Sequence, residues 1–204
     1  MKANIYIDGF NFYYGCIRKT PYHWLNIAKL CQLLLPRDEI ATIKYFTALV
    51  TPRPNDPEKL IRQERYLRAL KTIPNLEIIK GTFLSHTVTM RLAPPQTGFA
   101  KVIKTEEKGS DVNIATHLLI DGFMNKYELA VIVSNDSDLL EPIRFVKEGL
   151  NKPVGILNPQ KNPSVALQPL AYFIKNIRKG ALSKSLFPNT LSDEKGSFSK
   201  PSSW

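Results

Sequence analysis

Short apolar runs typical of β-strands alternate with helical patterns along most of this chain. The runs "ANIYI" (residues 3–7) and "ELAVIVSN" (128–135) are rich in apolar and β-branched residues. Segments 58–73 and 110–123 instead place apolar residues three and four positions apart, which is typical of amphipathic helices. Strands that alternate with helices favour a parallel sheet with helices on both faces. We therefore predict a three-layer, Rossmann-like α/β fold with a mainly parallel central sheet.

The length and the apolar content are those of one domain. The chain has 204 residues, of which 43% are hydrophobic, enough for one sizeable core. We expect this domain to span residues 1–179. Weak alternation around "APPQTG" predicts an inserted hairpin or flap at 82–104. Residues 180–204 are rich in Ser, Lys and Pro, so we predict a flexible C-terminal tail.

The formal charge of +10 indicates a polyanionic partner. Nucleic acid is favoured over an anionic membrane, because no amphipathic basic helix stands out. No stretch approaches the ~20 apolar residues of a membrane span, and no signal peptide opens the sequence. Cys16 and Cys31 have neither disulfide-framework nor zinc-site spacing, so we expect reduced thiols and a cytoplasmic protein.

Several acids follow strands or open helices. Asp8 comes directly after the strand at 3–7, and Asp136 comes directly after the strand at 128–135. The carboxyl ends of parallel strands share one edge of a sheet, where ligands bind. Asp111 opens the helix that follows "EEKG", and Asp138 lies two residues beyond Asp136. If the two strands are neighbours, all four carboxylates are expected to meet in one cleft.

Helix capping is the alternative explanation for some of these acids. Asp111 would favour a helix N-terminus through the macrodipole, and Asp138 has capping-box spacing to Glu141. Asp8 is not expected to cap a helix, because the aromatic run "FNFYY" that follows it requires no charge. The acids thus leave both capping and a ligand site open, with Asp8 as the argument for the ligand site.

A cluster of carboxylates requires a cation or bound protons. Each like-charged pair at ~5 Å costs about 3 kcal/mol at an effective dielectric constant of 20. Ligands that are all oxygen select Mg²⁺ or Mn²⁺ over zinc. Such a site can generate a hydroxide nucleophile and stabilise negative charge during attack on a phosphodiester.

Three sequence blocks resemble the signature blocks of NYN domains, which are related to LabA and DUF88 proteins in the PIN-like nuclease superfamily. The blocks are "IYIDGFNFYYG", "KGSDVNIATHLL" and "AVIVSNDSDLLEPIRFVKEG", and the resemblance covers roughly residues 3–178. It implies a PIN-like α/β fold and metal-dependent ribonuclease activity. It also implies a metal site and a residue that helps to place the substrate: Asp8, Asp111, Asp136 and Asp138 for the metal, and Asn11 for the substrate.

The sequence departs from the family pattern at two places. The third block more often carries Gly where this chain has Asn135, which is expected to alter a tight turn without removing a carboxylate. An Asp is expected after the last helix, where this chain has Ala171 and Tyr172. The second departure concerns the far edge of the sheet and leaves the four acids unaffected.

Basic residues recur every three positions along segment 58–73, and two explanations remain open. A solvated helix face is the simpler one. The other is a channel that contacts RNA phosphates. The residues expected to line this channel are Arg53, Arg62, Arg65, Lys104 and Lys108.

Aromatic and histidine side chains suggest further roles. Phe12, Tyr13 and Tyr14 could stack on unpaired bases, although aromatic residues beside a strand are more often core, so we expect only one of the three to be exposed. His117 lies among apolar helix residues, and we expect a buried, hydrogen-bonded imidazole with no catalytic role.

The leading hypothesis is a Mg²⁺- or Mn²⁺-dependent ribonuclease, expected to be an endonuclease, acting on single-stranded or structured RNA. The competing hypothesis is a catalytically weak PIN-like module that binds RNA or a partner protein and acts as a regulator. The sequence leaves the RNA target, the number of metal ions and a homodimeric state open.

Overall fold

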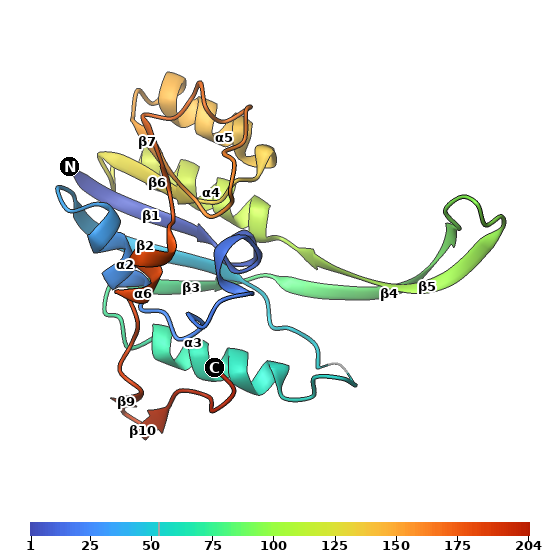
Figure 1. Cartoon of the computed structure of the whole chain (residues 1–204). Coiled ribbons are helices and arrows are strands. Elements are labelled where there is room, and N and C mark those ends of the chain that lie inside the picture. The colour runs from blue at the N-terminus through green and yellow to red at the C-terminus, as the bar shows by residue number, and fades with distance from the viewer. Residues whose placement is uncertain (53) are drawn as a thin grey trace.

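The computed structural model describes residues 1–52 and 54–204, and its centre is a six-stranded sheet (Figure 1). Neighbouring strands are parallel throughout. Across the sheet the order is β3 (Leu76–Lys80), β2 (Glu39–Thr47), β1 (Lys2–Asp8), β6 (Leu129–Val133), β7 (Val154–Asn158) and β8 (Phe173–Asn176). The predicted α/β class with a mainly parallel sheet is confirmed.

The strand order reverses at β1. The chain first adds β2 and β3 on one side of β1, and later adds β6, β7 and β8 on its other side. Ile7 of β1 is paired with Val133 of β6, so the two strands end side by side. In open α/β sheets, ligands bind beyond the carboxyl ends of the strands at this point of reversal. Asp8, the last residue of β1, therefore lies where a ligand site is expected.

Helices cover both faces of the sheet (Figure 1). One face packs against α2 (Ile27–Leu34) and α3 (Lys59–Leu70), and the other packs against α4 (Ser110–Phe123) and α5 (Leu140–Arg144). Because successive side chains of a strand point to opposite faces, Ile5 and Ile7 join the first core, and Tyr6 joins the second. Among the described residues, no helix has both the length and the apolar character that crossing a membrane requires.

Short helical turns follow the two central strands. After β1 come α1 (Gly9–Phe12) and the π-helical turn η1 (Tyr13–Ile17). After β6 come the 3₁₀ turn η2 (Ser137–Leu139), α5 and the π-helical turn η3 (Phe145–Gly149). Single π-helical turns such as η1 occur often at functional sites, and η1 and η2 both lie at the carboxyl edge of the sheet.

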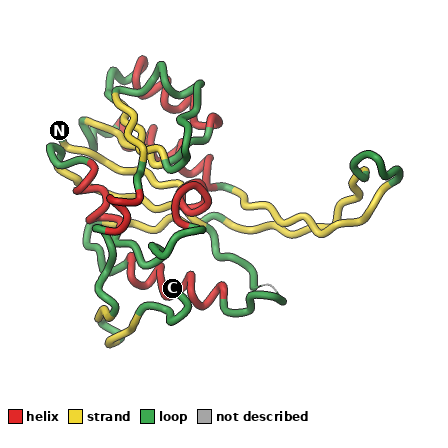
Figure 2. Tube along the Cα trace, in the orientation of Figure 1, coloured by secondary structure: helices red, strands yellow, loops and turns green. Residues whose placement is uncertain are grey.

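A two-stranded arm extends away from the body (Figures 1 and 2). It consists of β4 (Thr82–Arg91) and β5 (Phe99–Lys108), which pair antiparallel with each other in a sheet of their own. The arm leaves the body directly after β3 and returns directly before α4. The structure thus has a hairpin in the region where the sequence predicts a hairpin or flap, and it continues to Lys108.

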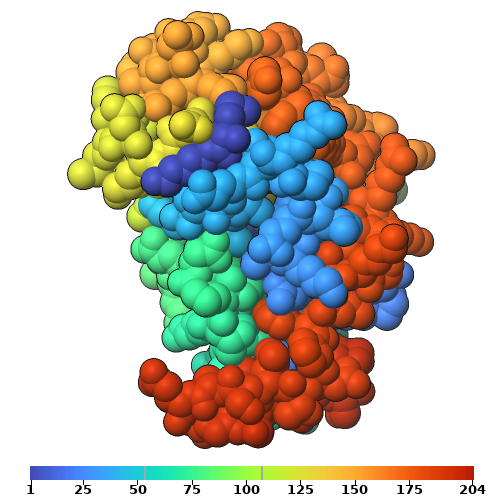
Figure 3. Space-filling view, turned by 90° about the vertical axis from the view of Figure 1, so that its left-hand side faces the viewer, coloured from blue at the N-terminus to red at the C-terminus, as the bar shows by residue number. Residues whose placement is uncertain are grey.

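The segment after residue 178 packs against the body, which differs from the flexible tail expected from its composition. It forms α6 (Lys179–Ser183) and a hairpin of β9 (Thr190–Asp193) and β10 (Gly196–Ser199). It lies along the lower part of the molecule in Figure 3. Phe187 and Phe198 are buried beside Trp24, whose Nε1 donates to the Pro188 carbonyl at 2.7 Å. The few apolar residues of this segment thus pack into the same hydrophobic core, around Trp24.

Candidate metal centre

Three carboxylates from distant parts of the chain converge at the carboxyl edge of the sheet. Asp8 ends β1, Asp136 follows β6, and Asp111 lies in the first turn of α4. One carboxylate oxygen from each residue lies within 4.8 Å of the other two. Asp8 is buried, Asp136 is half-buried and Asp111 is exposed. The pairing of β1 with β6 supplies the adjacency on which this convergence depends.

Asp138 is not part of this group of three, although we expected four acids to meet. It is an exposed residue of η2, and its backbone N–H donates to Oδ1 of Asp136 at 3.0 Å. Asp136 therefore caps the turn that carries Asp138. Asp138 helps to fix the orientation of Asp136, while its own side chain lies outside the group.

Asp8 has a capping role that its sequence context did not predict. Its Oδ1 accepts hydrogen bonds from the backbone N–H groups of Phe10 at 3.1 Å and Asn11 at 2.9 Å. The aromatic run forms α1 rather than an irregular loop, so the N-terminus of this helix requires an acceptor. Gly9 is required here, because a Cβ at this position would lie 2.6 Å from the Phe46 carbonyl oxygen.

The second oxygen of Asp8 ties the two strand ends together. Oδ2 accepts from the Ser134 hydroxyl at 3.1 Å, and Ser134 Oγ in turn accepts from the Asp136 backbone N–H at 3.1 Å. Ser134 was not among the predicted site residues. Its position as a polar residue at the end of an apolar strand is the signal that could have identified it.

Burial raises the pKa of Asp8, and the negative charge of Asp136 acts in the same direction. Hydrogen bonds from Asn11 and Ser134 oppose this shift and are outweighed by burial. The fold therefore holds a carboxyl group that is costly to ionise beside two further acids. A divalent cation would offset this cost, and three carboxylates are a ligand set that suits Mg²⁺ or Mn²⁺. The residues present fit such an ion.

Two asparagines join the loops around the acids. Oδ1 of Asn11 accepts from the backbone N–H of Asn135 at 3.1 Å. The Asn135 side chain donates to the Asn162 carbonyl at 3.0 Å and accepts from the Ser164 backbone N–H at 2.7 Å. The departure from Gly at position 135 thus connects the loop after β6 with the loop after β7. Asn11 both contacts this loop and faces the cleft around the acids.

This acidic cleft has a volume of about 640 Å³ and is polar around the carboxylates. Lys161 contributes a cation to its wall, which the sequence analysis did not select. The lining residues are Asp8, Phe10, Asn11, Tyr14, Gly15, Ser110, Asp111, Asp136, Gln160 and Lys161. The cleft thus combines the three acids with a cation and two amide side chains.

Four residues expected to contact RNA phosphates lie outside this lining: Arg62, Arg65, Lys104 and Lys108. Nη2 of Arg62 forms an ion pair with Asp56 at 2.6 Å, and Arg65 is exposed on α3. On the arm, Nζ of Lys104 and Nζ of Lys108 pair with Glu106 at 2.5 and 3.2 Å. Arg53, the fifth expected contact, falls outside the described residues.

An aromatic pocket of about 150 Å³ lies beside the acidic cleft. Its walls come from α1, η1, the end of β2, α3 and Trp204. Phe10 and Tyr14 line both the pocket and the cleft. Of the aromatic run, Tyr14 is 55% exposed whereas Phe12 is buried and Tyr13 is half-buried, which agrees with the expectation of one exposed ring.

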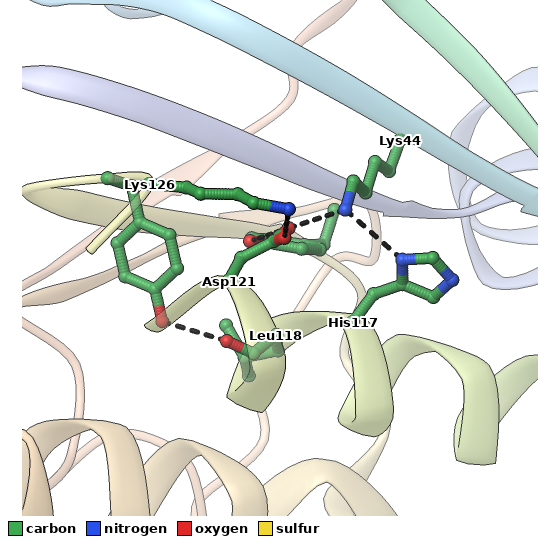
Figure 4. Close-up of polar contacts among 7 residues, drawn as sticks. Lys44, His117, Leu118, Asp121 and Lys126 are labelled. Atoms are coloured by element: carbon green, nitrogen blue, oxygen red, sulfur yellow. Dashed lines mark hydrogen bonds and ion pairs between the residues drawn. The ribbon is translucent and has the colours of Figure 1, made fainter. Parts of the chain in front are cut away.

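A separate polar cluster lies between the sheet and α4 (Figure 4). Nζ of Lys44 donates to Oδ2 of the buried Asp121 at 2.5 Å, and Tyr6 Oη donates to the same oxygen at 2.9 Å. Lys44 also donates to Nδ1 of His117 at 3.1 Å, so the imidazole is hydrogen-bonded as expected, but it is half-buried rather than buried. Burial lowers the pKa of His117, and the positive charge of Lys44 adds to this effect. None of these residues lines the acidic cleft.

Known proteins resemble most or all of the chain. A protein of unknown function, VPA0982 from Vibrio parahaemolyticus, has a similar solved structure with a TM-score of 0.60 and 16% identity, covering 91% of this chain and 96% of that one. At this identity the similarity concerns the fold alone. The 6-hydroxy-3-succinoylpyridine 3-monooxygenase HspA of Pseudomonas putida is 28% identical over 236 residues, covering 100% of this chain and 75% of that protein.

A family model matches most of the chain. The model of the NYN domain matches residues 2–177, which include the three converging acids, Asn11 and the complete six-stranded sheet. The match begins at the first residue of β1 and ends just after β8, so it includes all the strands and helices that carry the three acids. This chain belongs to the NYN domain family, within the PIN-like nuclease superfamily.

Proposed function

We propose that this protein is a metal-dependent ribonuclease that hydrolyses RNA phosphodiester bonds, with endonucleolytic cleavage as the expected type. The observation that carries the proposal is the convergence of Asp8, Asp111 and Asp136 at the point where the strand order reverses. Membership of the NYN family supports it, because this family belongs to a nuclease superfamily. The formal charge of +10 suits a polyanionic substrate.

The three carboxylates would hold Mg²⁺ or Mn²⁺. Like charges at ~5 Å repel by about 3 kcal/mol per pair at an effective dielectric constant of 20, so the group favours a cation. When bound, such an ion supplies a hydroxide nucleophile and stabilises the charge that develops on the phosphate. Asp8 is held in place at both of its oxygens, by the backbone N–H groups of Phe10 and Asn11 and by the Ser134 hydroxyl.

Other residues of the cleft, together with basic residues of the arm, would bind and orient the RNA backbone. Lys161 and Gln160 lie in the wall beside the acids, where a cation and an amide can contact phosphate oxygens. Lys104 and Lys108 lie on the arm, which returns to the body directly before the turn that carries Asp111. A strand held by these groups would place one phosphate against the three carboxylates.

Cleavage of a labelled RNA pool by the purified protein tests this proposal. We expect cleavage with Mn²⁺ or Mg²⁺ and none with EDTA. Asp136→Asn and Asp111→Asn should each reduce the rate by at least about 100-fold, a typical cost of removing one electrostatic group from an active site. Asp138→Asn is the matched control and should retain most of the activity, because Asp138 lies outside the group of three.

Two results would contradict the ribonuclease proposal. One is cleavage that persists in EDTA, which would indicate a contaminating nuclease or a mechanism without metal. The other is RNA binding without cleavage under either metal ion, which would favour the alternative of a catalytically weak module that binds RNA and acts as a regulator.

A second candidate function is oxygenation of a heteroaromatic ring. It is favoured by the 28% identity to a protein named as a pyridine monooxygenase and by the aromatic pocket beside the cleft. The ligand set argues for hydrolysis instead, because three carboxylates differ from the two-His, one-carboxylate set of non-haem iron oxygenases. Oxygen uptake in the presence of a hydroxypyridine and a reductant would detect this activity.

A further inference from the structure

The aromatic pocket adjoins the acidic cleft and has a different chemistry. Phe10 and Tyr14 line both cavities, so these two side chains lie where the cleft and the pocket adjoin. The cleft offers carboxylates, amides and a lysine, whereas the pocket is mainly apolar. A ligand that fills both must therefore combine an ionic part with an apolar part.

The walls of the pocket suit a planar ring. Tyr13 lies edge-on to Tyr14 with ring centroids 5.3 Å apart, and Trp204 stacks on His23 at 5.3 Å with an interplanar angle of 29°. Tyr66 completes this side of the pocket, with its ring 6.0 Å from that of Trp204. A cavity of about 150 Å³ is large enough for a benzene-sized ring.

The pocket also has a polar side. Nη2 of Arg62 donates to both carboxylate oxygens of Asp56 at 2.6 and 2.8 Å, and both residues line the pocket. Together they present N–H donors and carboxylate acceptors, which are the groups that read the polar edge of a base. Gln63 holds this wall in place, because it accepts from the Val50 backbone N–H and donates to the Ala48 carbonyl.

We propose that the aromatic pocket binds one unpaired base of the RNA strand whose phosphate lies in the acidic cleft. This inference rests on the proposed ribonuclease function and narrows its substrate to RNA that is single-stranded at this position, because a paired and stacked base cannot enter a pocket between aromatic side chains. The base would stack on the aromatic walls and present its polar edge to Arg62 and Asp56. The ribose and phosphate would pass Phe10 and Tyr14 into the cleft.

Mononucleotide binding in EDTA tests the pocket without any cleavage. The chain has two tryptophans, Trp24 and Trp204, with rings 6.3 Å apart, so their fluorescence reports on this region. We expect at least one of AMP, GMP, CMP and UMP to bind at least tenfold more tightly than ribose 5-phosphate, which lacks the ring. Equal affinity for ribose 5-phosphate and all four nucleotides would overturn the proposal.

Two pocket variants locate the binding. Tyr13→Leu keeps the apolar volume and removes the ring, while Val50→Trp fills the pocket from its wall. Each should weaken nucleotide binding about 10- to 100-fold, the range found when base stacking is lost. Tyr172→Leu is the matched control, because Tyr172 is 65% exposed and does not line the pocket. Unchanged binding in both pocket variants would overturn the proposal.

Two competitors identify the occupant. A fully paired RNA duplex should displace the bound nucleotide at least tenfold less well than the same sequence as a single strand. A free hydroxypyridine that binds at least as tightly as the best nucleotide would overturn the proposal and indicate a small-molecule site. RNA cleavage with Mn²⁺ but without base binding would support the ribonuclease function and overturn only the proposed base pocket. Base binding without cleavage would support the base pocket and contradict the ribonuclease function.

Discussion

Asp8 shows how one side chain can serve both the fold and a ligand site. Its Oδ1 caps α1, its Oδ2 binds Ser134, and the same carboxyl group lies within 4.8 Å of two other acids. Capping and metal binding are therefore compatible here, although the sequence presents them as alternatives. The backbone N–H groups that satisfy the cap also hold the carboxylate beside the other two acids.

Repulsion among the acids predicts how Asp136→Asn affects stability. The substitution removes one charge with little change of shape, so it should raise the free energy of unfolding of the metal-free protein. Excess Mn²⁺ should stabilise the wild type by about 2.7 kcal/mol at 100 times the Kd, and should stabilise the variant much less. Calorimetry of both proteins with Mn²⁺ and with EDTA measures this. A metal-free variant less stable than wild type, with an unchanged response to Mn²⁺, would mean that Asp136 acts only as a cap.

The buried pair of Lys44 and Asp121 predicts a strongly non-additive effect of mutation. Asp121→Leu leaves the Lys44 ammonium buried without its carboxylate, which should cost about 3–5 kcal/mol of unfolding free energy. Adding Lys44→Met should recover most of this loss, because no buried charge then remains. Urea unfolding of both single variants and the double variant tests the coupling. Glu141→Gln, which breaks the exposed pair with Arg144, is the control and should change stability by at most about 0.5 kcal/mol.

Acidic pH should weaken the same cluster. Burial would raise the pKa of Asp121, but hydrogen bonds from Lys44 and Tyr6 hold it below its usual value. The stability that Asp121 contributes is therefore present above the usual Asp range and is lost as the pH falls through its lowered pKa. The double variant should lose this part of the acid dependence.

At the scale of secondary structure, the arm is the element with the least support from the body. Its two strands pair only with each other among the described residues, and both Phe99 and Ile103 are more than 70% exposed. Phe83 at its base contacts Phe10 of the acidic cleft with ring centroids 5.5 Å apart. The arm is thus joined to the site at one end, and its free length is available to contact a bound strand.

Salt dependence of RNA binding tests the basic side chains of the arm. Lys104→Ala with Lys108→Ala should weaken binding and make the slope of log K against log salt shallower by about 1.4, at about 0.7 for each single-strand phosphate contact. Lys2→Ala with Arg37→Ala is the control, because both residues are exposed near the amino ends of β1 and β2, at the opposite edge from Asp8. Equal slopes in the two double variants would mean that Lys104 and Lys108 do not contact RNA phosphates and only form ion pairs with Glu106.

At the scale of the whole molecule, the segment after residue 178 belongs to the core and to the aromatic pocket. Phe187 and Phe198 are 6% and 8% exposed, and Trp204 lines the pocket. Arg68 of α3 fixes the hairpin through two hydrogen bonds to Asp193 at 2.7 and 2.6 Å. This segment therefore connects α3, Trp24 and the aromatic pocket.

Substitution of Phe187 distinguishes a packed segment from a flexible tail. Phe187→Ala should lower the free energy of unfolding by about 3–5 kcal/mol, because it removes a buried ring beside Trp24. Val165→Ala is the control, since Val165 is 81% exposed. Thermal unfolding of both variants measures the difference. Equal melting temperatures of the two variants would mean that residues 180–204 form a flexible tail.

The sequence by itself determined the local features of this protein. Alternating strand and helix patterns predict the parallel α/β sheet, and the positions of Asp8 and Asp136 at strand ends predict their shared edge. The sheet follows from the spacing of apolar residues along the chain, and the shared edge follows because parallel strands all end on the same side of a sheet. Both can be recognised from short stretches of sequence.

Only the tertiary structure decided which distant segments meet. It paired β1 with β6 and brought Asp111 close to Asp8 and Asp136, whereas Asp138 is not part of this group. It also placed Trp204 in the wall of the aromatic pocket, together with residues of η1 and α3. It also gave the segment after residue 178 a place in the core, where Phe187 and Phe198 surround Trp24. Local patterns cannot supply these contacts, because each depends on how surfaces far apart in the chain bury apolar area against one another.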